Sequence, residues 1–251
     1  MNYRKYTTYK DIEDIKRLEY IVASITAGTP AGGRILDIGC GNGNISIALG
    51  SLGYNVTGID MDAATIENAK KNNKFKNVEF KVLNANDITP GTKFDAVVCS
   101  EVLEHLSNPE LLVEQIGKLL KKDGIFLATV PNGYGPREVL ITKPVQFLNK
   151  KGFYKVITGA KKLMGFRNMT LQSSSGDLTH IQFFTRKRLS RIISHRGFRE
   201  ISFKHGNFVE RVLPFSILTR RIKSLQKVDC NIADKLPSFA VSAFYSAWQK
   251  A

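Results

Sequence analysis

The chain has 251 residues, 43% of them apolar, and a net charge of +15, so it can bury a full core as one domain with an elaboration. Its three cysteines, Cys40, Cys99 and Cys230, are scattered, which excludes a disulfide framework and leads us to predict no metal site. The polar amino terminus lacks a signal-peptide core and no uncharged apolar run nears 18 residues, so we expect a cytoplasmic protein.

The positive charge belongs to the second half of the chain. Residues 1–133 hold 15 Lys and Arg against 16 Asp and Glu, whereas residues 134–251 hold 22 against 6. Such asymmetry predicts an anionic partner for the carboxyl-terminal half. The alternative is a solvated basic surface that only maintains solubility.

The first half alternates between predicted helices and strands. Apolar residues at helical spacing predict a leading helix over residues 11–26. Asn108 is predicted to cap a later helix that has Pro109 in its first turn. This alternation is typical of a parallel α/β sheet. The other predicted elements are strands at 34–38, 55–60, 78–83, 94–100 and 125–130 and helices at 44–52 and 63–72.

The alternation stops after Pro131 and resumes near residue 180. Residues 134–178 are long, basic and irregular, so we interpret them as an insertion and not as a second domain. Thr185 is then predicted to cap a helix, and residues 198–204 and 238–248 are predicted strands.

Three glycines at alternate positions connect the first strand to the following helix. In "RILDIGCGNGNISIAL" these are Gly39, Gly41 and Gly43. Such a turn leaves backbone N–H groups uncovered at a helix amino terminus, which suits a nucleotide-like ligand. The dinucleotide pattern G-x-G-x-x-G fails, because its third glycine would fall at Asn44 or Ser46.

The motif that remains is D-x-G-x-G-x-G beginning at Asp37, with "GIDMD" at the next strand end. This pattern resembles the class I S-adenosylmethionine-dependent methyltransferases over residues 12–133. The likeness continues more loosely through 180–250, where "HIQFFTRKRLSRIISHRGF" is similar to the small-molecule members.

The resemblance implies an α/β fold, a doubly wound Rossmann-like, mostly parallel seven-stranded sheet with an antiparallel last strand and helices on both faces. It implies one methyltransferase domain over 1–251. Within it, residues 12–133 form the cofactor-binding core, 134–178 a basic lid or insertion, and 179–251 the helix and strands that complete the sheet. The implied cofactor is S-adenosylmethionine, which leaves as S-adenosylhomocysteine.

The resemblance also assigns roles at the strand ends. The glycines would wrap the methionine moiety and the ribose, and Asp37 would face the cofactor's ammonium group. Asp60 would accept hydrogen bonds from both ribose hydroxyls, as an acid at this place does in dinucleotide folds. Glu101 would contact the methionine end of the cofactor or the substrate, or it would cap a helix. The remaining candidates would contact the adenine or complete the site: Met61, Asn86, Asp87, Ile88, Cys40 and Ser100.

Methyl transfer from a sulfonium requires mainly alignment, and a base is needed only where the nucleophile must lose a proton. The residues after the fourth strand, "SEVL", lack the [Asn/Asp]-Pro-Pro-aromatic motif that the family uses on amino groups of nucleobases. His105 and His180 are the candidate catalytic residues. Alternatively, His105 holds a loop and His180 bonds the backbone.

The insertion contains a predicted basic amphipathic helix, with apolar residues from Phe153 to Met164 on one face. Its arrangement is similar to that of the ubiquinone-pathway O-methyltransferases, which implies a lid over the acceptor or a contact with an anionic membrane surface. The candidate acceptor-binding residues are Lys155, Lys161, Lys162 and Tyr134.

We therefore expect an O-methyltransferase that acts on a small anionic, phosphorylated, glycan-precursor or lipid-linked acceptor, cytoplasmic or peripheral on the inner face of the membrane. An N-methyltransferase on a small phosphorylated amine is one alternative. An RNA methyltransferase would also explain the basic half, although no RNA-binding module is recognisable and nucleic acid is the less favoured partner. An intact glycine turn disfavours a non-catalytic membrane-associated scaffold.

Overall fold

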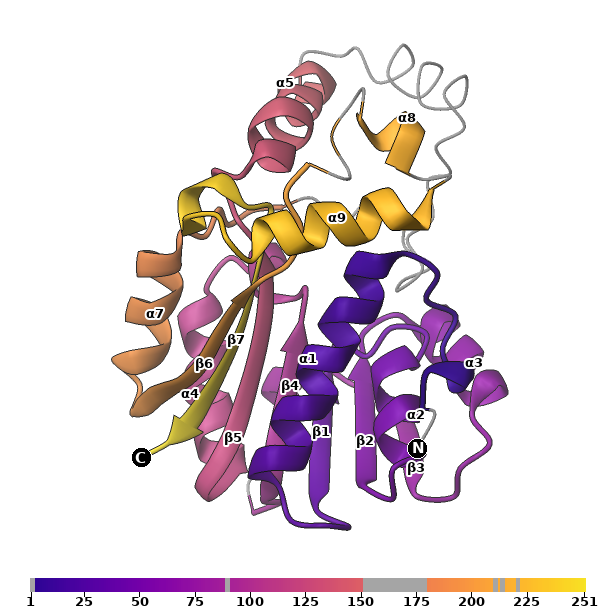
Figure 1. Ribbon diagram of the computed structural model, residues 1–251. Coiled ribbons are helices and arrows are strands. Elements are labelled where there is room, and N and C mark those ends of the chain that lie inside the picture. Colours follow the sequence, from indigo (N-terminus) through magenta and orange to yellow (C-terminus); the bar gives the residue numbers. More distant parts are fainter. Residues whose placement is uncertain (1–2, 89–90, 151–179, 210–211, 213–214, 220–221) are drawn as a thin grey trace.

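The computed structural model describes residues 3–88, 91–150, 180–209, 212, 215–219 and 222–251. A seven-stranded sheet in the order β3-β2-β1-β4-β5-β7-β6 forms its centre (Figure 1). β7 is antiparallel to both neighbours and the other neighbouring strands are parallel, so the predicted fold class is confirmed. The strands are β1 (Arg34–Ile38), β2 (Asn55–Asp60), β3 (Val78–Val82), β4 (Phe94–Ser100), β5 (Leu120–Pro131), β6 (Phe198–His205) and β7 (Ala243–Lys250).

Helices cover both faces of the sheet. Side chains of α1, α2 and α3 belong to the core on one face, and those of α4 and α7 to the core on the other. α9 lies across the upper end, against α1 (Figure 1). The helices are α1 (Ile12–Gly28), α2 (Asn44–Gly50), α3 (Ala63–Asn72), α4 (Pro109–Leu119), α5 (Lys143–Lys150), α7 (Arg186–Ser194), α8 (Phe215–Thr219) and α9 (Lys223–Ala233).

The central strands consist mainly of apolar residues, as expected for strands that are buried on both faces. In β5, Ile125 and Leu127 contribute to the core beneath α1, whereas Phe126 and Ala128 contribute to the core beneath α4 and α7. This division follows from the alternation of side chains along a strand. The two cores fix the sheet between its helices, and the carboxyl ends of the parallel strands meet at one edge.

Several predicted boundaries need correction. β7 begins at Ala243 and not at residue 238, because a 3-10 turn, η5 (Ser238–Ala240), follows Pro237. α2 ends at Gly50, two residues early, since the chain tightens into turns before Gly53. The sequence pattern predicted no helix where α5, α8 and α9 lie, and β5 starts earlier than expected, at Leu120.

The first part of the predicted insertion is regular. Residues 138–142 form a π-helical turn, η4 (Glu138–Thr142), which leads directly into α5. The expectation of an irregular segment is therefore wrong for residues 138–150. The predicted amphipathic helix, with Lys155, Lys161 and Lys162, lies outside the described residues.

The two predicted helix caps differ. The Thr185 hydroxyl accepts a hydrogen bond from the Arg188 N–H at 3.1 Å, which confirms that it caps α7. Asn108 stands before α4, but its side chain makes no capping hydrogen bond, so that prediction is wrong. Its backbone, with φ of −135° and ψ of 81°, departs from the extended conformation typical of capping residues.

We predict that Thr185→Ala lowers the free energy of unfolding by about 1 kcal/mol, because the Arg188 N–H loses its acceptor. Urea denaturation followed by circular dichroism measures the change. Asn108→Ala is the matched control and should change stability by less than about 0.5 kcal/mol. Equal losses in both variants would contradict the assignment.

Candidate functional site

The glycine turn between β1 and α2 is held by the end of β2. The Gly39 and Cys40 N–H groups both donate to the Ile59 carbonyl, at 2.8 and 3.0 Å. The Gly41 N–H donates to Asp60 Oδ2 at 3.0 Å. Gly39, Gly41 and Gly43 have φ values of +68°, +53° and +81°, a conformation that favours glycine.

Two of these glycines also lie too close to their neighbours to accept a side chain. A Cβ atom on Gly43 would lie 2.6 Å from Cζ of Phe80, and one on Gly39 would collide with Cγ2 of Val102. The turn therefore packs with its backbone against the middle of β3 and against the loop after β4. The N–H groups of Gly39, Cys40, Gly41 and Gly43 are all bonded within the fold, so the expectation of uncovered N–H groups is wrong for these four residues.

Asp37 is buried at the end of β1 beneath this turn. The Ser46 hydroxyl donates to its Oδ2 at 2.6 Å, and among the described residues its buried Oδ1 has no hydrogen-bond partner. Burial raises the pKa of Asp37 to about 7, against the lowering effect of the Ser46 hydrogen bond, and the nearby Asp60 raises it further. An unsatisfied buried carboxylate oxygen fits a cationic group such as the ammonium of S-adenosylmethionine.

Asp60 stands at the end of β2 and organises two segments. Its Oδ2 accepts from the Gly41 N–H, and its Oδ1 accepts from the Asp62 N–H at 3.0 Å. The side chain of Met61, next to Asp60, is 70% exposed, which is unusual for an apolar residue. A flat apolar ligand would cover this side chain. These positions agree with the predicted ribose and adenine contacts, which remain predictions.

The other predicted adenine contacts lie after β3. Asp87 is exposed in the 3-10 turn η2 (Ala85–Asp87), and Ile88 is buried. The side chain of Asn86 lies outside the described residues. Cys40 is buried in the glycine turn, where burial raises the pKa of its thiol well above the ordinary value, so it serves there as a small apolar residue.

The end of β4 carries a short chain of hydroxyl and carboxylate groups. Ser100 Oγ lies 2.9 Å from Thr129 Oγ1, which in turn donates to Glu101 Oε1 at 3.0 Å. Glu101 has a φ of +58°, a conformation uncommon for residues other than glycine. Such backbone strain is concentrated at ligand sites. The predicted contact of Glu101 with the cofactor remains a prediction.

A buried cation that the sequence analysis missed faces Glu101. Arg17 in α1 is 3% exposed, and its guanidinium lies 2.9 Å from Asp14, 3.8 Å from Glu101 and 3.9 Å from Glu13. Burial alone would lower its pKa, but these three carboxylates outweigh burial and raise it. The only sequence signal was the spacing of Glu13, Asp14 and Arg17, which usually marks a solvated helix face.

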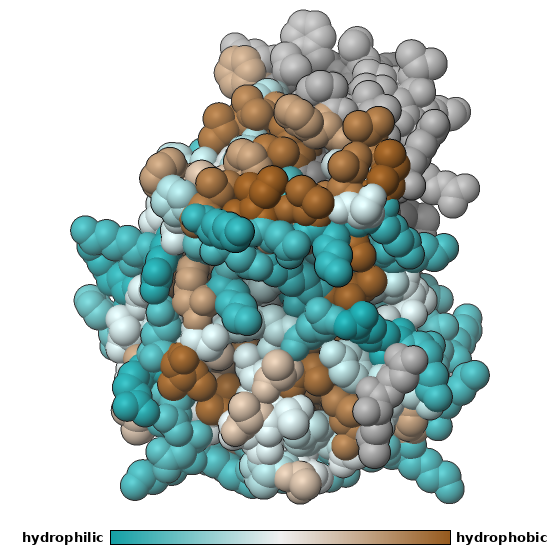
Figure 2. All heavy atoms as spheres, viewed as in Figure 1, coloured by the Kyte–Doolittle hydropathy of each residue, from teal (hydrophilic) through white to brown (hydrophobic). Residues whose placement is uncertain are grey.

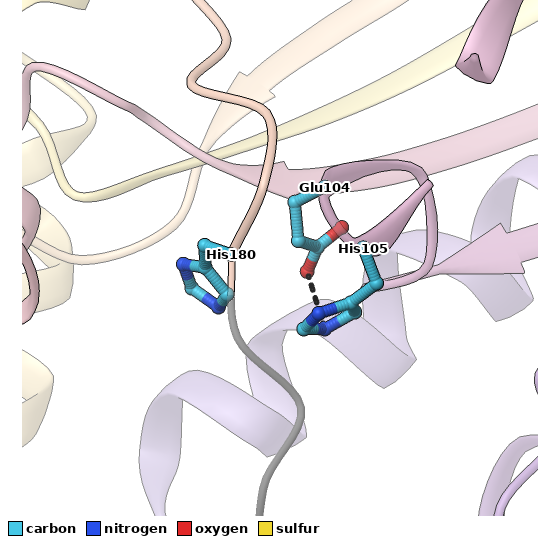
Figure 3. A group of neighbouring side chains, drawn as sticks. All are labelled: Glu104, His105 and His180. Carbon is cyan, nitrogen blue, oxygen red and sulfur yellow. Dashed lines mark ion pairs between the residues drawn. The ribbon is translucent and has the colours of Figure 1, made fainter. Parts of the chain in front are cut away.

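His105 and His180 meet although they lie far apart in the chain. The Ile181 and Gln182 N–H groups both donate to the Glu104 carbonyl, at 2.8 and 2.9 Å, which brings His180 beside the 3-10 turn η3 (Leu103–His105). The two imidazole rings lie edge to face with centroids 5.1 Å apart. Figure 3 shows both rings beside the Glu104 side chain, whose Oε1 lies 3.7 Å from His105 Nε2.

One potential ligand atom from each of Glu104, His105 and His180 lies within 4.8 Å of the others, a grouping that the sequence spacing did not predict. A metal-bound carboxylate must be ionised. Burial raises the pKa of Glu104 well above its ordinary value, and the negative charge of Glu101 raises it further. The three side chains form a cluster of acidic and basic groups beside the end of β4.

A second carboxylate, also missed by the sequence analysis, contacts His180. Glu138 in η4 is fully buried, and its Oε1 lies 3.2 Å from His180 Nδ1. The Thr142 hydroxyl donates to the same oxygen at 3.0 Å. Burial opposes ionisation, yet the hydrogen bond with His180, aided by Arg137 and Thr142, lowers the pKa of Glu138.

Tyr134, the remaining predicted acceptor contact, is 60% exposed after the end of β5. Lys143 Nζ lies 4.1 Å from the centroid of its ring. The ring also lines a pocket together with Arg186, Lys187 and Phe239. Aromatic and cationic side chains therefore meet at this end of the sheet.

We predict that Asp37→Asn changes the pH dependence of stability. Between pH 4 and 7 the folded protein keeps Asp37 protonated while the unfolded chain ionises it, so wild-type stability falls as the pH rises. The amide of the variant cannot ionise, so the stability difference should shift in favour of the variant by up to about 1.4 kcal/mol per pH unit.

Urea denaturation at pH 4, 5, 6 and 7 measures this difference. Asp123→Asn is the control, because Asp123 is exposed and its φ of +60° also suits asparagine. Parallel stability–pH curves for wild type and Asp37→Asn would show that Asp37 ionises normally.

Comparison with known proteins agrees with this geometry. A family model described as "Methyltransferase domain" matches residues 7–202. The ubiquinone biosynthesis O-methyltransferase of Glaesserella parasuis serovar 5 (strain SH0165) is 34% identical over 127 residues, which cover 47% of this chain and 54% of that protein. The chain thus matches about half the length of this curated relative.

Solved structures share the fold at low sequence identity. The magnesium protoporphyrin IX methyltransferase of Synechocystis PCC 6803, solved with bound SAH, aligns with a TM-score of 0.59 and 15% identity over 96% of this chain and 84% of that one. The [4+2]-cyclase SpnF aligns with a TM-score of 0.56 and 16% identity over 93% of this chain and 81% of that one. The fold alone therefore does not determine the reaction. The family model does identify the chain, which belongs to the S-adenosylmethionine-dependent methyltransferases that its glycine turn predicts.

Proposed function

We propose that this protein transfers the methyl group of S-adenosylmethionine to a hydroxyl group of a small anionic or lipid-linked acceptor. The observation that carries the proposal is the polar edge at the ends of β1, β2 and β4, where Asp37, Asp60 and Glu101 surround the bare glycine turn. The matching family model and the O-methyltransferase relatives support the same reaction.

The residues present fit the cofactor. Asp60 would bind the ribose hydroxyls, the exposed Met61 would cover the adenine, and the unsatisfied Oδ1 of Asp37 would face the ammonium. Arg17, whose buried Nε has no hydrogen-bond partner among the described residues, offers a cation to the carboxylate of the methionine moiety. The cofactor itself supplies an activated methyl carbon.

The pair of histidines favours oxygen as the methylated atom. A neutral amine can attack a sulfonium methyl with its own lone pair, whereas an alcohol becomes a good nucleophile only as its proton leaves. His180 lies at the carboxyl end of the sheet, 16% exposed and beside His105, and can receive that proton. N-methylation of a small amine remains the alternative.

An apolar band on the surface supports a lipid-linked acceptor. Figure 2 shows apolar side chains gathered over α8, α9 and α5, above a row of hydrophilic ones. On α9, Val228 is 51% and Ile232 43% exposed, next to the exposed Lys227. Exposed apolar residues flanked by lysines suit the surface of an anionic bilayer.

None of the helices that the structure describes is long and apolar enough to cross a membrane. The role of residues 134–178 as lid or anchor, with Lys155, Lys161 and Lys162, remains a prediction. RNA is the competing anionic acceptor because the same charge asymmetry would serve it.

We predict that calorimetric titration detects S-adenosylhomocysteine binding and no NADH binding. Asp60→Asn should weaken the nucleoside about 10- to 100-fold, because an amide cannot accept from both ribose hydroxyls while it retains its contacts with Gly41 and Asp62. Asp123→Asn, an exposed site elsewhere, should bind like the wild type. NADH binding without a response to S-adenosylhomocysteine would refute the proposal.

We predict that the protein sediments with vesicles of phosphatidylglycerol and phosphatidylcholine, and that Val228→Ser combined with Ile232→Ser weakens this binding about tenfold. Leu111→Ser is the control, because Leu111 is 58% exposed on α4, away from the band. Equal vesicle binding by the double variant and the control would exclude the band as the contact surface.

A further inference from the structure

We infer that Glu138 is a positioning residue that holds His180 in the tautomer needed to take a proton from the acceptor hydroxyl. The contact that carries this inference is the 3.2 Å distance between Glu138 Oε1 and His180 Nδ1. The inference rests on the proposed O-methyltransferase function, which does not by itself require Glu138.

The surroundings of Glu138 fix its carboxylate. The side chain is fully buried in the π-helical turn η4, and the Thr142 hydroxyl bonds to the same Oε1 that faces His180. π-helical turns are rare and occur frequently at functional sites. An ionised carboxylate can only accept hydrogen bonds, so the His180 nitrogen that faces it must carry the hydrogen.

A hydrogen on Nδ1 leaves the lone pair of neutral His180 on Nε2. The other ionisable groups near this ring are His105 at its edge and, beyond it, Glu104, with Arg137 near Glu138. The ring is held from below by Glu138 and along the chain by the Ile181 and Gln182 bonds to the Glu104 carbonyl. Neither the Glu138 contact nor these backbone bonds involve Nε2 itself. Together they set the orientation of the ring and therefore the direction of Nε2.

The reaction step then balances. The acceptor oxygen forms a bond to the methyl carbon while the carbon–sulfur bond breaks and its electron pair goes to sulfur, which gives S-adenosylhomocysteine. The hydroxyl proton moves to His180 Nε2, and the Glu138 carboxylate stabilises the imidazolium that results. A carboxylate that orients a histidine base in this way is a recurring arrangement in enzymes.

Nuclear magnetic resonance of protein labelled with ¹⁵N-histidine tests the inference without an acceptor. The chain has four histidines, and loss of one signal in His180→Gln assigns His180. At a pH where the ring is neutral, wild-type His180 should be the Nδ1–H tautomer. Glu138→Gln can still accept the hydrogen bond and should retain it, whereas Glu138→Leu should lower the Nδ1–H to Nε2–H ratio about tenfold or more.

Thr142→Val is the matched control, since it removes a partner of Glu138 but leaves the carboxylate, and it should retain the Nδ1–H tautomer. An Nε2–H tautomer in the wild type, or one tautomer unchanged in all variants, would overturn the inference. Titration of the same samples with S-adenosylhomocysteine tests the proposed function separately. Wild-type protein that fails to bind this nucleoside would refute that function, whatever the tautomer.

Discussion

The site depends first on the bonds that attach the glycine turn to the end of β2. Because the Ile59 carbonyl accepts from both Gly39 and Cys40, and Asp60 accepts from Gly41, the path of the turn follows the register of β1 against β2. A shift in that register would move the turn and the carboxylates together. The geometry of the cofactor site is therefore a consequence of sheet pairing and needs no separate scaffold.

Buried charge connects the leading helix to the same edge. A lone buried guanidinium would be costly, and Arg17 is stabilised by carboxylates from its own helix and by Glu101 at the end of β4. The same edge carries the positive φ of Glu101 and a buried oxygen of Asp37 that has no hydrogen-bond partner within the described part of the protein. Both belong to the predicted cofactor site, and conflicts of this kind are expected at functional sites.

Most of the sheet and the cofactor edge could be predicted from the sequence because their signals are local. A glycine turn after an apolar strand, or an acid such as Asp60 at a strand end, is visible within a few residues. The meeting of His105 with His180 was not, because it depends on the Glu104 carbonyl, a backbone group without a sequence signature. Helix α9 was missed because two of its larger apolar residues, Val228 and Ile232, are exposed, whereas its buried residues include the polar Gln226 and Asp229.

The contacts of Glu138 and His180 also explain how the segment between them is tied to the site. η4 and α5 precede residues 151–179, and His180 follows them, so the ion pair joins the two ends of this stretch. The bonds from Ile181 and Gln182 to the Glu104 carbonyl attach the second end to the loop after β4. Both ends of the basic stretch are thus fixed beside the histidines by buried polar contacts. Because the two ends of a loop determine the entropy of closing it, these contacts fix where the basic stretch leaves the fold and where it returns.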